Sequence, residues 1–415
     1  MKILIITSYF YPTNCIAAFR MNAFAKYFRQ AGHEVTVIAE GLEDKTERWE
    51  GCEVRYVKDP VTPSYVIREA SDRDFGSKWR PRRILKALVY RVTGNPSYFW
   101  CRKALGIARR LLIEGWIDTV LSTYGYDVPS HFCALRLREE FPAFYWIADF
   151  RDEPNFKWQE RLNWSIPFWH SMVLRRLRRR MQQVLDRSDL LLSVSKPIVE
   201  ELRSASSHGR VLEIRNGYDY PEAYDSNFQD RFTMAYLGHF YSGIHPDNWF
   251  RAYAELIDED RLPADGVIKI VGNTEPIWIP EAIRANVVEI PAVPHDEAVR
   301  ISICETDALV MIYSKSAGRK GVYSGKLLDY LATNKPLIAI YDPDEVVGDL
   351  MNETGAGFAV GEEDIPAIKE AIMKCFDLWR NKRALPRNWD RIKEHRRSHQ
   401  VGLLLDYLEK KANKS

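Results

Sequence analysis

Residues 2–39 read KILIITSYFYPTNCIAAFRMNAFAKYFRQAGHEVTVIA, and this stretch decides the fold. Its two ends, KILIIT and EVTVIA, are apolar runs of strand length. Between them, apolar residues recur at helical spacing, at Met21, Phe24, Ala25 and Phe28, and a glycine follows where the helix should stop. The pattern predicts two parallel strands joined by a helical crossover.

The same alternation of apolar strands and helical segments continues along the chain and is interrupted once. Serine, asparagine, aspartate and glycine accumulate between Ser204 and Arg231, and a second series of apolar runs follows. We therefore predict an α/β protein with two Rossmann-like, doubly wound domains that face a central cleft. The first domain is expected at residues 1–205 and the second at 206–385. Residues 386–415 are expected to form a terminal helix on the second domain or one that crosses back to the first.

The composition excludes several classes of protein. A chain of 415 residues with 46% hydrophobic and 28% charged residues is typical of a folded protein. A net charge of +2 gives no general attraction to nucleic acid. The six cysteines contain no CxxC pair, which argues against a zinc site or a disulfide framework, and no apolar run is long enough to span a membrane. We expect a cytoplasmic protein with reduced thiols and no metal.

Residues 318–340, GRKGVYSGKLLDYLATNKPLIAI, have the composition of an anion site. The glycines, the cations and the N-terminus of a helix capped by Ser324 would suit a diphosphate. Asp329, one turn after Lys326, could accept hydrogen bonds from the vicinal hydroxyls of a ribose. A solvated basic helix with an ordinary ion pair would explain the spacing equally well. The candidate donor-binding residues in this stretch are Arg319, Lys320, Ser324, Gly325, Lys326 and Asp329.

This stretch resembles the donor-site segment of retaining glycosyltransferases of the GT-B fold, the family-four group, in which SKLxEYLAxGKPVIA carries the second glutamate of an E-x7-E motif. Residues 3–39 resemble the opening strand, loop and helix of that family. Further similar segments follow in the same order, namely YWIADFRDEP (145–154), VSKPIVEELR (194–203), IRNGYD (214–219) and YLGHFYSG (236–243). The resemblance implies a GT-B fold, a UDP- or GDP-type sugar as donor, retention of configuration and no cofactor.

Two positions depart from the family's pattern. Asp329 stands at the second glutamate, which binds the donor ribose, but Gly321 stands at the first, which contacts the donor sugar. The loop after Gly238 has His239 where the family has the arginine and lysine that hold the donor phosphates. We expect the cations of residues 318–340 to replace them. The remaining donor-side candidates are Gly238, His239 and Asn216. Asn216 stands in an NG pair that the family places near the hinge and that an ordinary tight turn also explains.

The segment ADFRDEP, residues 148–154, ends a strand of the first domain and contains the catalytic candidates Asp149, Arg151 and Asp152. The arginine would face developing negative charge, and a carboxylate would orient or deprotonate an acceptor hydroxyl. The alternative is an internal Asp/Arg pair that rigidifies the loop. The acceptor-binding candidates are Asn14, Arg20, Tyr124 and Asp127. Arg20 fits a helix surface equally well, and ordinary turn chemistry is the competing interpretation of the last two.

Two basic stretches stand out against the nearly neutral whole: RDFGSKWRPRRILKALVYR (73–91) and RRLRRRMQQVLDR (175–187). Basic amphipathic helices beside aromatic residues are typical of surfaces that bind anionic lipid. We expect peripheral attachment to the inner face of the cytoplasmic membrane and a saccharide acceptor on a polyprenyl carrier. Relatives of this kind build O-antigen, capsule or other exopolysaccharide. A solvated arginine-rich helix face is the alternative.

The expected function is thus a glycosyltransferase of polysaccharide biosynthesis. The alternative is a GT-B protein that binds a nucleotide sugar or a glycan without turnover. Gly321 and the missing phosphate-binding cations after Gly238 favour this alternative.

Overall fold

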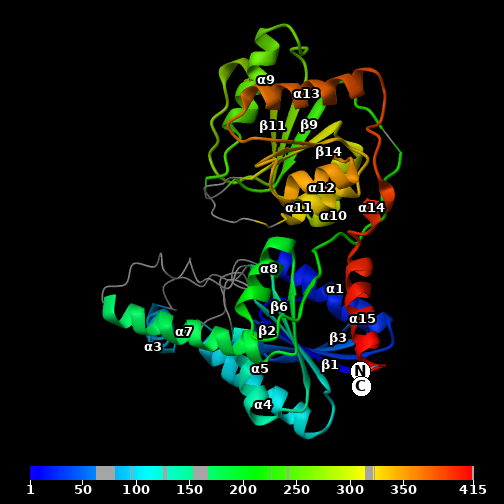
Figure 1. The fold of residues 1–415 in the computed structure, drawn as a ribbon. Helices are drawn as coiled ribbons and strands as arrows, with labels where there is room; N and C mark the ends of the chain where they lie inside the picture. Colours follow the sequence, from blue (N-terminus) through cyan, green and yellow to red (C-terminus); the bar gives the residue numbers. More distant parts are fainter. Residues whose placement is uncertain are drawn as a thin grey trace. The chain divides into compact units, whose positions relative to one another are not determined.

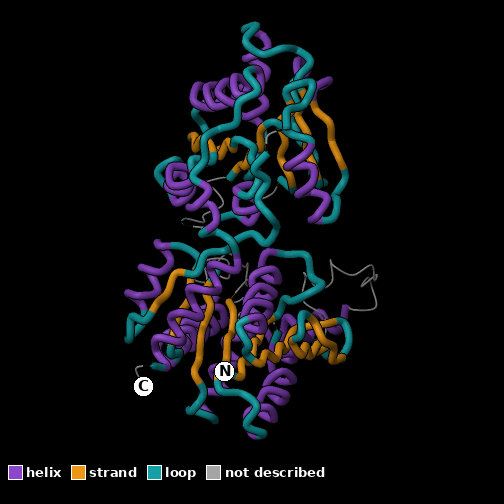
Figure 2. The backbone as a smooth tube through the Cα atoms, turned by 90° about the vertical axis from the view of Figure 1, so that its right-hand side faces the viewer, coloured by secondary structure: helices purple, strands orange, loops and turns teal. Residues whose placement is uncertain are grey.

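The computed structural model describes most of the chain. The described residues are 1–61, 80–93, 95, 97–124, 129–152, 167–225, 227–240, 243–313, 321 and 323–413. The chain forms two compact units, one of Met1–Arg215 with Gln400–Ser415 and one of Asn216–His399 (Figure 1). In each unit helices cover both faces of a sheet, and Figure 2 shows the strands enclosed between them.

The first unit is built on a sheet whose described strands follow the order β3-β4-β2-β1-β5-β6-β7-β8. The strands are β1 (Lys2–Thr7), β2 (Glu34–Gly41), β3 (Lys45–Trp49), β4 (Cys52–Lys58), β5 (Thr119–Tyr124), β6 (Tyr145–Phe150), β7 (Leu190–Ser193) and β8 (Val211–Glu213). Neighbouring strands are parallel except β3 and β4, which form a hairpin. The helices are α1 (Ile16–Gln30), α3 (Arg80–Thr93), α4 (Tyr98–Ile113), α5 (Pro129–Glu140), α7 (Pro167–Arg187), α8 (Lys196–Ala205) and most of α15 (Arg397–Ala412).

The strand–helix–strand unit predicted at residues 2–39 is confirmed. β1 and β2 pair in parallel, with Lys2 opposite Glu34, and α1 connects them. Burial is nearly complete at the four helix positions expected to face the core, Met21, Phe24, Ala25 and Phe28. The middle of β1 is buried on both faces, because helices lie on both sides of this sheet and both sets of alternating side chains meet apolar neighbours.

The second unit has a sheet of parallel strands in the order β11-β10-β9-β12-β13-β14. All of them lie in the second series of apolar runs, which follows Arg231: β9 (Thr233–Leu237), β10 (Val267–Val271), β11 (Val287–Ile290), β12 (Ala308–Ile312), β13 (Leu337–Ile340) and β14 (Gly357–Val360). The helices are α9 (Asp247–Asp258), α10 (His295–Cys304), α11 (Gly325–Leu331), α12 (Val346–Thr354), α13 (Ile365–Arg380), α14 (Trp389–Lys393) and a 3₁₀ helix at Glu281–Asn286.

The division between the units differs from the one expected at residues 205 and 206. β8 lies beyond that point, yet it pairs with β7 and extends the first sheet, so the first unit continues to Arg215. The expected terminal helix at 386–415 is two helices, of which α14 belongs to the second unit. α15 packs its apolar face into the core of the first unit through Val401, Leu404 and Leu408.

Each sheet has a point at which the strand order reverses. In the first sheet the chain leaves β1 toward β2 on one side and later returns to β5 on the other, and in the second sheet β9 lies between β10 and β12 in the same way. Connections leave in opposite directions at such a point, which opens a crevice at the carboxyl ends of the two central strands. Ligands of such sheets bind beside these strand ends.

Candidate functional site

Gly238 and Lys326 meet at the reversal point of the second sheet. Gly238 directly follows β9, and Lys326 lies on α11, which follows β12 in sequence. The glycine has a φ of +122°, and a Cβ atom on it would lie 2.1 Å from Nζ of Lys326. A side chain at this position would be strained and would displace the amine. Two predicted donor-binding residues are thus in contact across the end of β9.

The amine of Lys326 is held by an aromatic side chain. Its Nζ donates to the hydroxyl of Tyr236 at 3.2 Å and lies 4.6 Å from the centre of that ring, a cation–π arrangement. Tyr236 stacks on Phe240 at 4.3 Å and donates to the carbonyl of His239 at 3.0 Å. Burial lowers the pKa of Lys326 to about 8. No carboxylate within the described ranges forms an ion pair with this amine, so a bound anion would supply the missing compensation.

Asp329 lies one turn further along α11 and faces a histidine. Its Oδ2 is 3.8 Å from Nε2 of His295, at the start of α10, and its Oδ1 is buried without a hydrogen-bond partner among the residues that the structure describes. Burial raises the pKa of Asp329 to about 7, which the charge of Arg397 opposes and that of Asp219 reinforces. The Lys326–Asp329 ion pair offered as the alternative interpretation is not formed in the described structure, because each side chain points to other partners.

The N-terminus of α11 contributes less than expected. Ser324 caps the helix as predicted, and its Oγ accepts from the backbone N–H of Leu327 at 3.2 Å. The helix spans only Gly325–Leu331, and this cap already occupies one of its first N–H groups. Of the donor-binding cations predicted in residues 318–340, Lys326 is the one that the described part of the chain contains. Arg319 and Lys320, the other predicted cations, lie outside the described residues.

The two remaining donor-side candidates have different surroundings. His239 is exposed, with Nδ1 3.4 Å from the hydroxyl of Thr274. Asn216 begins the second unit, and its neighbour Gly217 is tightly packed, since an added Cβ would lie 2.2 Å from the carbonyl oxygen of His395. Asn216 thus belongs to a segment that runs beside the returning chain rather than to an isolated tight turn.

In the first unit, the predicted residues Asp149 and Arg20 form one buried ion pair. Arg20 donates from Nε to Oδ2 of Asp149 at 3.0 Å and from Nη2 to Oδ1 at 2.7 Å, and the two side chains are 4% and 0% exposed. Thr123 donates to the same carboxylate at 3.2 Å, and Nη1 of Arg20 donates to the carbonyl of Arg215 at 3.2 Å. This is the internal pair considered as the alternative, with Arg20 instead of Arg151 as the cation. A carboxylate so enclosed positions β6 against α1 and is not exposed to an acceptor.

Arg151 and Asp152 remain accessible at the end of β6. Both are half-buried. The charge of Arg151 acts on the N-terminal end of α1, where it opposes the burial that raises the pKa of Cys15. Asn14, next to that cysteine, is exposed. Tyr124 ends β5 with only its backbone described, and Asp127 lies outside the described residues.

Several residues that the sequence analysis did not single out complete these arrangements. Tyr236, His295 and Arg397 surround the side chains of α11, and only Pro294 before α10 marks His295 as the first residue of a helix. In the first unit, His131 is wholly buried with Nδ1 2.7 Å from the hydroxyl of Ser122, and burial lowers its pKa to about 3. It is a neutral core histidine.

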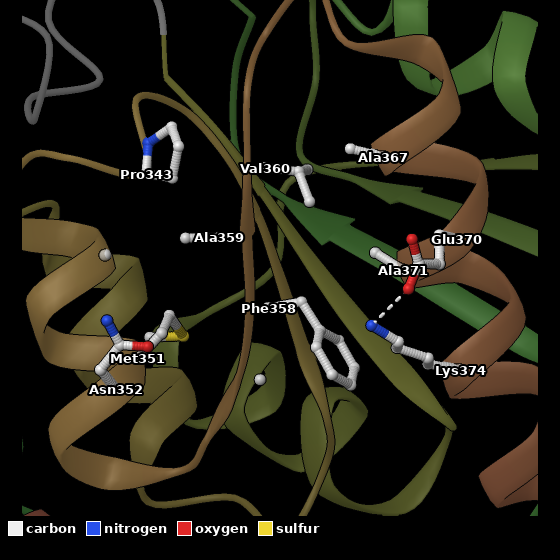
Figure 3. A pocket seen from close by; sticks show the side chains of 12 residues that line it. Pro343, Met351, Asn352, Phe358, Ala359, Val360, Ala367, Glu370, Ala371 and Lys374 are labelled. Atoms are coloured by element: carbon white, nitrogen blue, oxygen red, sulfur yellow. Dashed lines mark ion pairs between the residues drawn. The ribbon is translucent and has the colours of Figure 1, made fainter.

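A hollow of about 270 Å³ lies away from these residues, along β14 between α12 and α13 (Figure 3). Phe358 of β14 and the ion pair between Glu370 and Lys374, 2.7 Å apart, line it. The hollow follows the outer strand of the sheet rather than the reversal point, and none of the predicted site residues borders it.

The described structure contains no group of three or more His, Cys, Asp or Glu side chains with the arrangement of a metal site. Among the described helices, none combines the length and the apolar character needed to cross a bilayer.

No model of a protein family matches the sequence, and no curated protein matches it either. Solved structures match over nearly the whole chain. Anabaena Alr3699/HepE in complex with UDP-glucose has a TM-score of 0.59 at 11% identity, over 99% of this chain and 100% of that one. The lipopolysaccharide outer core galactosyltransferase WaaB in its apo form has a TM-score of 0.56 at 12% identity, over 99% and 100% of the two chains. The N-terminal domain of Candida albicans trehalose-6-phosphate phosphatase has a TM-score of 0.60 at 10% identity, over 99% and 97%.

At such identities the similarity shows the fold alone, which is that of the GT-B glycosyltransferases.

Proposed function

We propose that this chain is a glycosyltransferase that moves a sugar from a nucleotide-diphosphate sugar to a saccharide hydroxyl. The observation that carries the proposal is the contact of Lys326 with Gly238 at the reversal point of the second sheet, with the Asp329 carboxylate one turn away. An ammonium group at this strand end would attract a phosphate group and could form charge-assisted hydrogen bonds with it. The fold is shared with a galactosyltransferase and with Anabaena Alr3699/HepE, whose structure holds UDP-glucose.

The roles follow from charge and position. The Lys326 amine would bind the diphosphate and stabilise the charge that develops on it as the sugar leaves. Asp329 would accept hydrogen bonds from the ribose hydroxyls. Retention of configuration, and a UDP- or GDP-type donor, are proposed from the sequence resemblance to family four.

Gly321 stands at the position of the first glutamate in the family-four motif that the sequence resembles. It has a φ of +69°, a conformation that glycine adopts readily and a glutamate would adopt only with strain. The departure at the first glutamate is therefore part of the local backbone. We infer that other residues recognise the donor sugar.

On the acceptor side, the burial of Asp149 leaves Arg151 and Asp152 as the candidates at the end of β6. We propose that Asp152 orients or deprotonates the acceptor hydroxyl and that Arg151 offsets developing negative charge. The wholly buried Asp149–Arg20 pair holds the strand end in place beneath them.

We further propose that the acceptor is lipid-linked and that α3 rests on anionic lipid at the inner face of the cytoplasmic membrane. The helix leaves a row of large apolar side chains exposed, namely Ile84, Leu85, Leu88 and Val92. Its sequence RPRRILKALVYRVT contains five cations and no acidic residue. Such a helix gains from apolar insertion and from the negative surface potential together. The fraction of protein that sediments with phosphatidylglycerol vesicles should be much lower for Leu85→Glu/Leu88→Glu than for the parent. With neutral vesicles, which serve as the reference, the two proteins should not differ. Equal binding of parent and variant to the phosphatidylglycerol vesicles would contradict the proposal.

Calorimetric titration with UDP and with GDP tests the donor site. We expect one of them to bind the parent, and Lys326→Gln to weaken that binding about 10- to 150-fold, the loss of a charge-assisted hydrogen bond. Lys374→Gln, which removes a surface cation from α13, is the matched control and should bind like the parent. Equal affinity of Lys326→Gln and the parent would refute the site.

A non-catalytic binder is the alternative function, and donor turnover separates the two. The parent should release free nucleoside diphosphate from the donor that binds, slowly with water and faster with an acceptor. Binding without any release of nucleoside diphosphate under either condition would favour the binder.

A further inference from the structure

Two contacts with Tyr236 hold the amine of Lys326 in one place. Nζ lies 3.2 Å from the tyrosine hydroxyl and 4.6 Å from the centre of the ring, so one side chain supplies both a hydrogen-bond acceptor and a cation–π contact. Lysine has a flexible four-carbon stem, and holding this stem in one position costs side-chain entropy. An amine that is already held before a ligand arrives does not incur this cost during binding.

Tyr236 is itself fixed by its neighbours. It is 2% exposed, its ring stacks on Phe240 with the ring centres 4.3 Å apart, and its hydroxyl donates to the carbonyl of His239 at 3.0 Å. Because that hydrogen bond uses the hydroxyl proton, the tyrosine oxygen acts as the acceptor toward Lys326. The lysine must therefore be the donor, and it carries the necessary proton at pH 7, since burial lowers its pKa only to about 8.

The position of the amine suits an anion at the end of β9. An added Cβ on Gly238 would lie 2.1 Å from Nζ, so the amine lies against the backbone at the reversal point of the sheet. A protonated amine has three N–H groups. Tyr236 accepts from one of them, and the described ranges contain no other acceptor for this amine. Lys326 and Gly238 are both half-buried, so the other two N–H groups can donate to the oxygens of a phosphate that approaches this strand end.

On the basis of the function proposed above, we propose that Tyr236 is a positioning residue for the donor diphosphate and that it acts through the amine of Lys326. Its ring and hydroxyl hold the amine at the strand end before the nucleotide binds. A tyrosine that only packed the core would also affect folding, but its effect on nucleotide binding would not depend on Lys326. The coupling between the two side chains therefore separates a positioning role from a structural one.

The test is a double-mutant cycle on the full-length protein, measured by calorimetry with UDP or GDP, whichever binds the parent. Tyr236→Phe removes the hydroxyl but keeps the ring, and it should weaken binding about 5- to 10-fold. Tyr236→Leu removes both contacts and should weaken binding about 30-fold or more, so the conservative variant retains part of the affinity. Lys326→Met keeps an unbranched side chain but has no donor. In this background either replacement of Tyr236 should change the affinity by less than about 2-fold.

Tyr253→Phe is the matched control, because it removes the hydroxyl of a wholly buried tyrosine from α9 of the same unit, and it should bind like the parent. Tyr236→Leu serves as the test variant should Tyr236→Phe not fold, since it enters the same cycle with Lys326→Met. The inference is overturned, although the donor site stands, if replacing Tyr236 leaves binding unchanged or weakens it equally with and without the amine. If Lys326→Met binds like the parent, or if neither nucleotide binds the parent, the proposed donor site fails and this inference fails with it.

Discussion

Relative to the parent, the Asp329→Asn variant should be more stable at high pH than at low pH. The same replacement should remove nucleotide binding. The reason is that ionisation of the buried Asp329 carboxyl group destabilises the folded protein. Its pKa rises from 3.8 to about 7 on burial, so the folded protein holds this proton more tightly than the unfolded chain does. The free energy of unfolding must therefore fall as the pH rises from about 4 to about 7.

The size of the effect follows from the shift. At 1.36 kcal/mol for each unit of pKa, the burial of this titrating carboxyl group costs about 4 kcal/mol at about pH 8, where it is ionised, and about 1.7 kcal/mol at about pH 5, where folding requires its protonation, a difference of about 2.5 kcal/mol. The asparagine variant has no such pH dependence. Its amide carries a burial cost of its own, about 1–3 kcal/mol, but that cost is the same at both pH values and cancels in the comparison.

Urea unfolding followed by circular dichroism at the two pH values measures this difference. The stability of Asp329→Asn relative to the parent should improve by about 2 to 3 kcal/mol between about pH 5 and about pH 8. Asp390→Asn is the control, because that carboxylate is 97% exposed, and it should change stability by less than about 0.5 kcal/mol at either pH. A relative stability of Asp329→Asn that does not change with pH would refute the reasoning.

Two further predictions concern residues that the fold brings together. Arg20→Met leaves the Asp149 carboxylate buried without its cation and should lower the free energy of unfolding by about 3–5 kcal/mol. The double variant Arg20→Met/Asp149→Leu should lose less stability than this single variant. Additive losses of stability in chemical denaturation would contradict this prediction. Gly238→Ala should displace the amine of Lys326 and weaken nucleoside diphosphate binding about 10-fold or more in calorimetry. Gly106→Ala, where an added Cβ meets no atom within 4 Å, should bind like the parent, and equal affinity of both variants would argue against the contact.

Both sheets could be predicted because a strand that is buried in a parallel sheet has a recognisable apolar pattern within its own short segment. Each apolar run from β9 to β14 is short, continuous and followed by a helical pattern, so strand identity needs no long-range information. The β3–β4 hairpin was not predicted, although its turn contains a glycine, Gly51, in the sequence. Glu50 and Gly51 both have positive φ, at 48° and 78°, as a two-residue hairpin turn requires. β3 was not recognised because its exposed sequence KTERW carries no apolar run.

What the sequence determined by itself is the succession of strands and helices, the glycine-flanked helix at α11 and the residue types available to a nucleotide. What only the tertiary structure decided is which of them meet. Arg20 reaches Asp149 across 129 positions, and Lys326 reaches Tyr236 across 90. His295 comes to face Asp329 because α10 and α11 begin at the same end of the sheet. Pairing of this kind depends on strand order and on the burial of each charge, and neither is a property of any short segment.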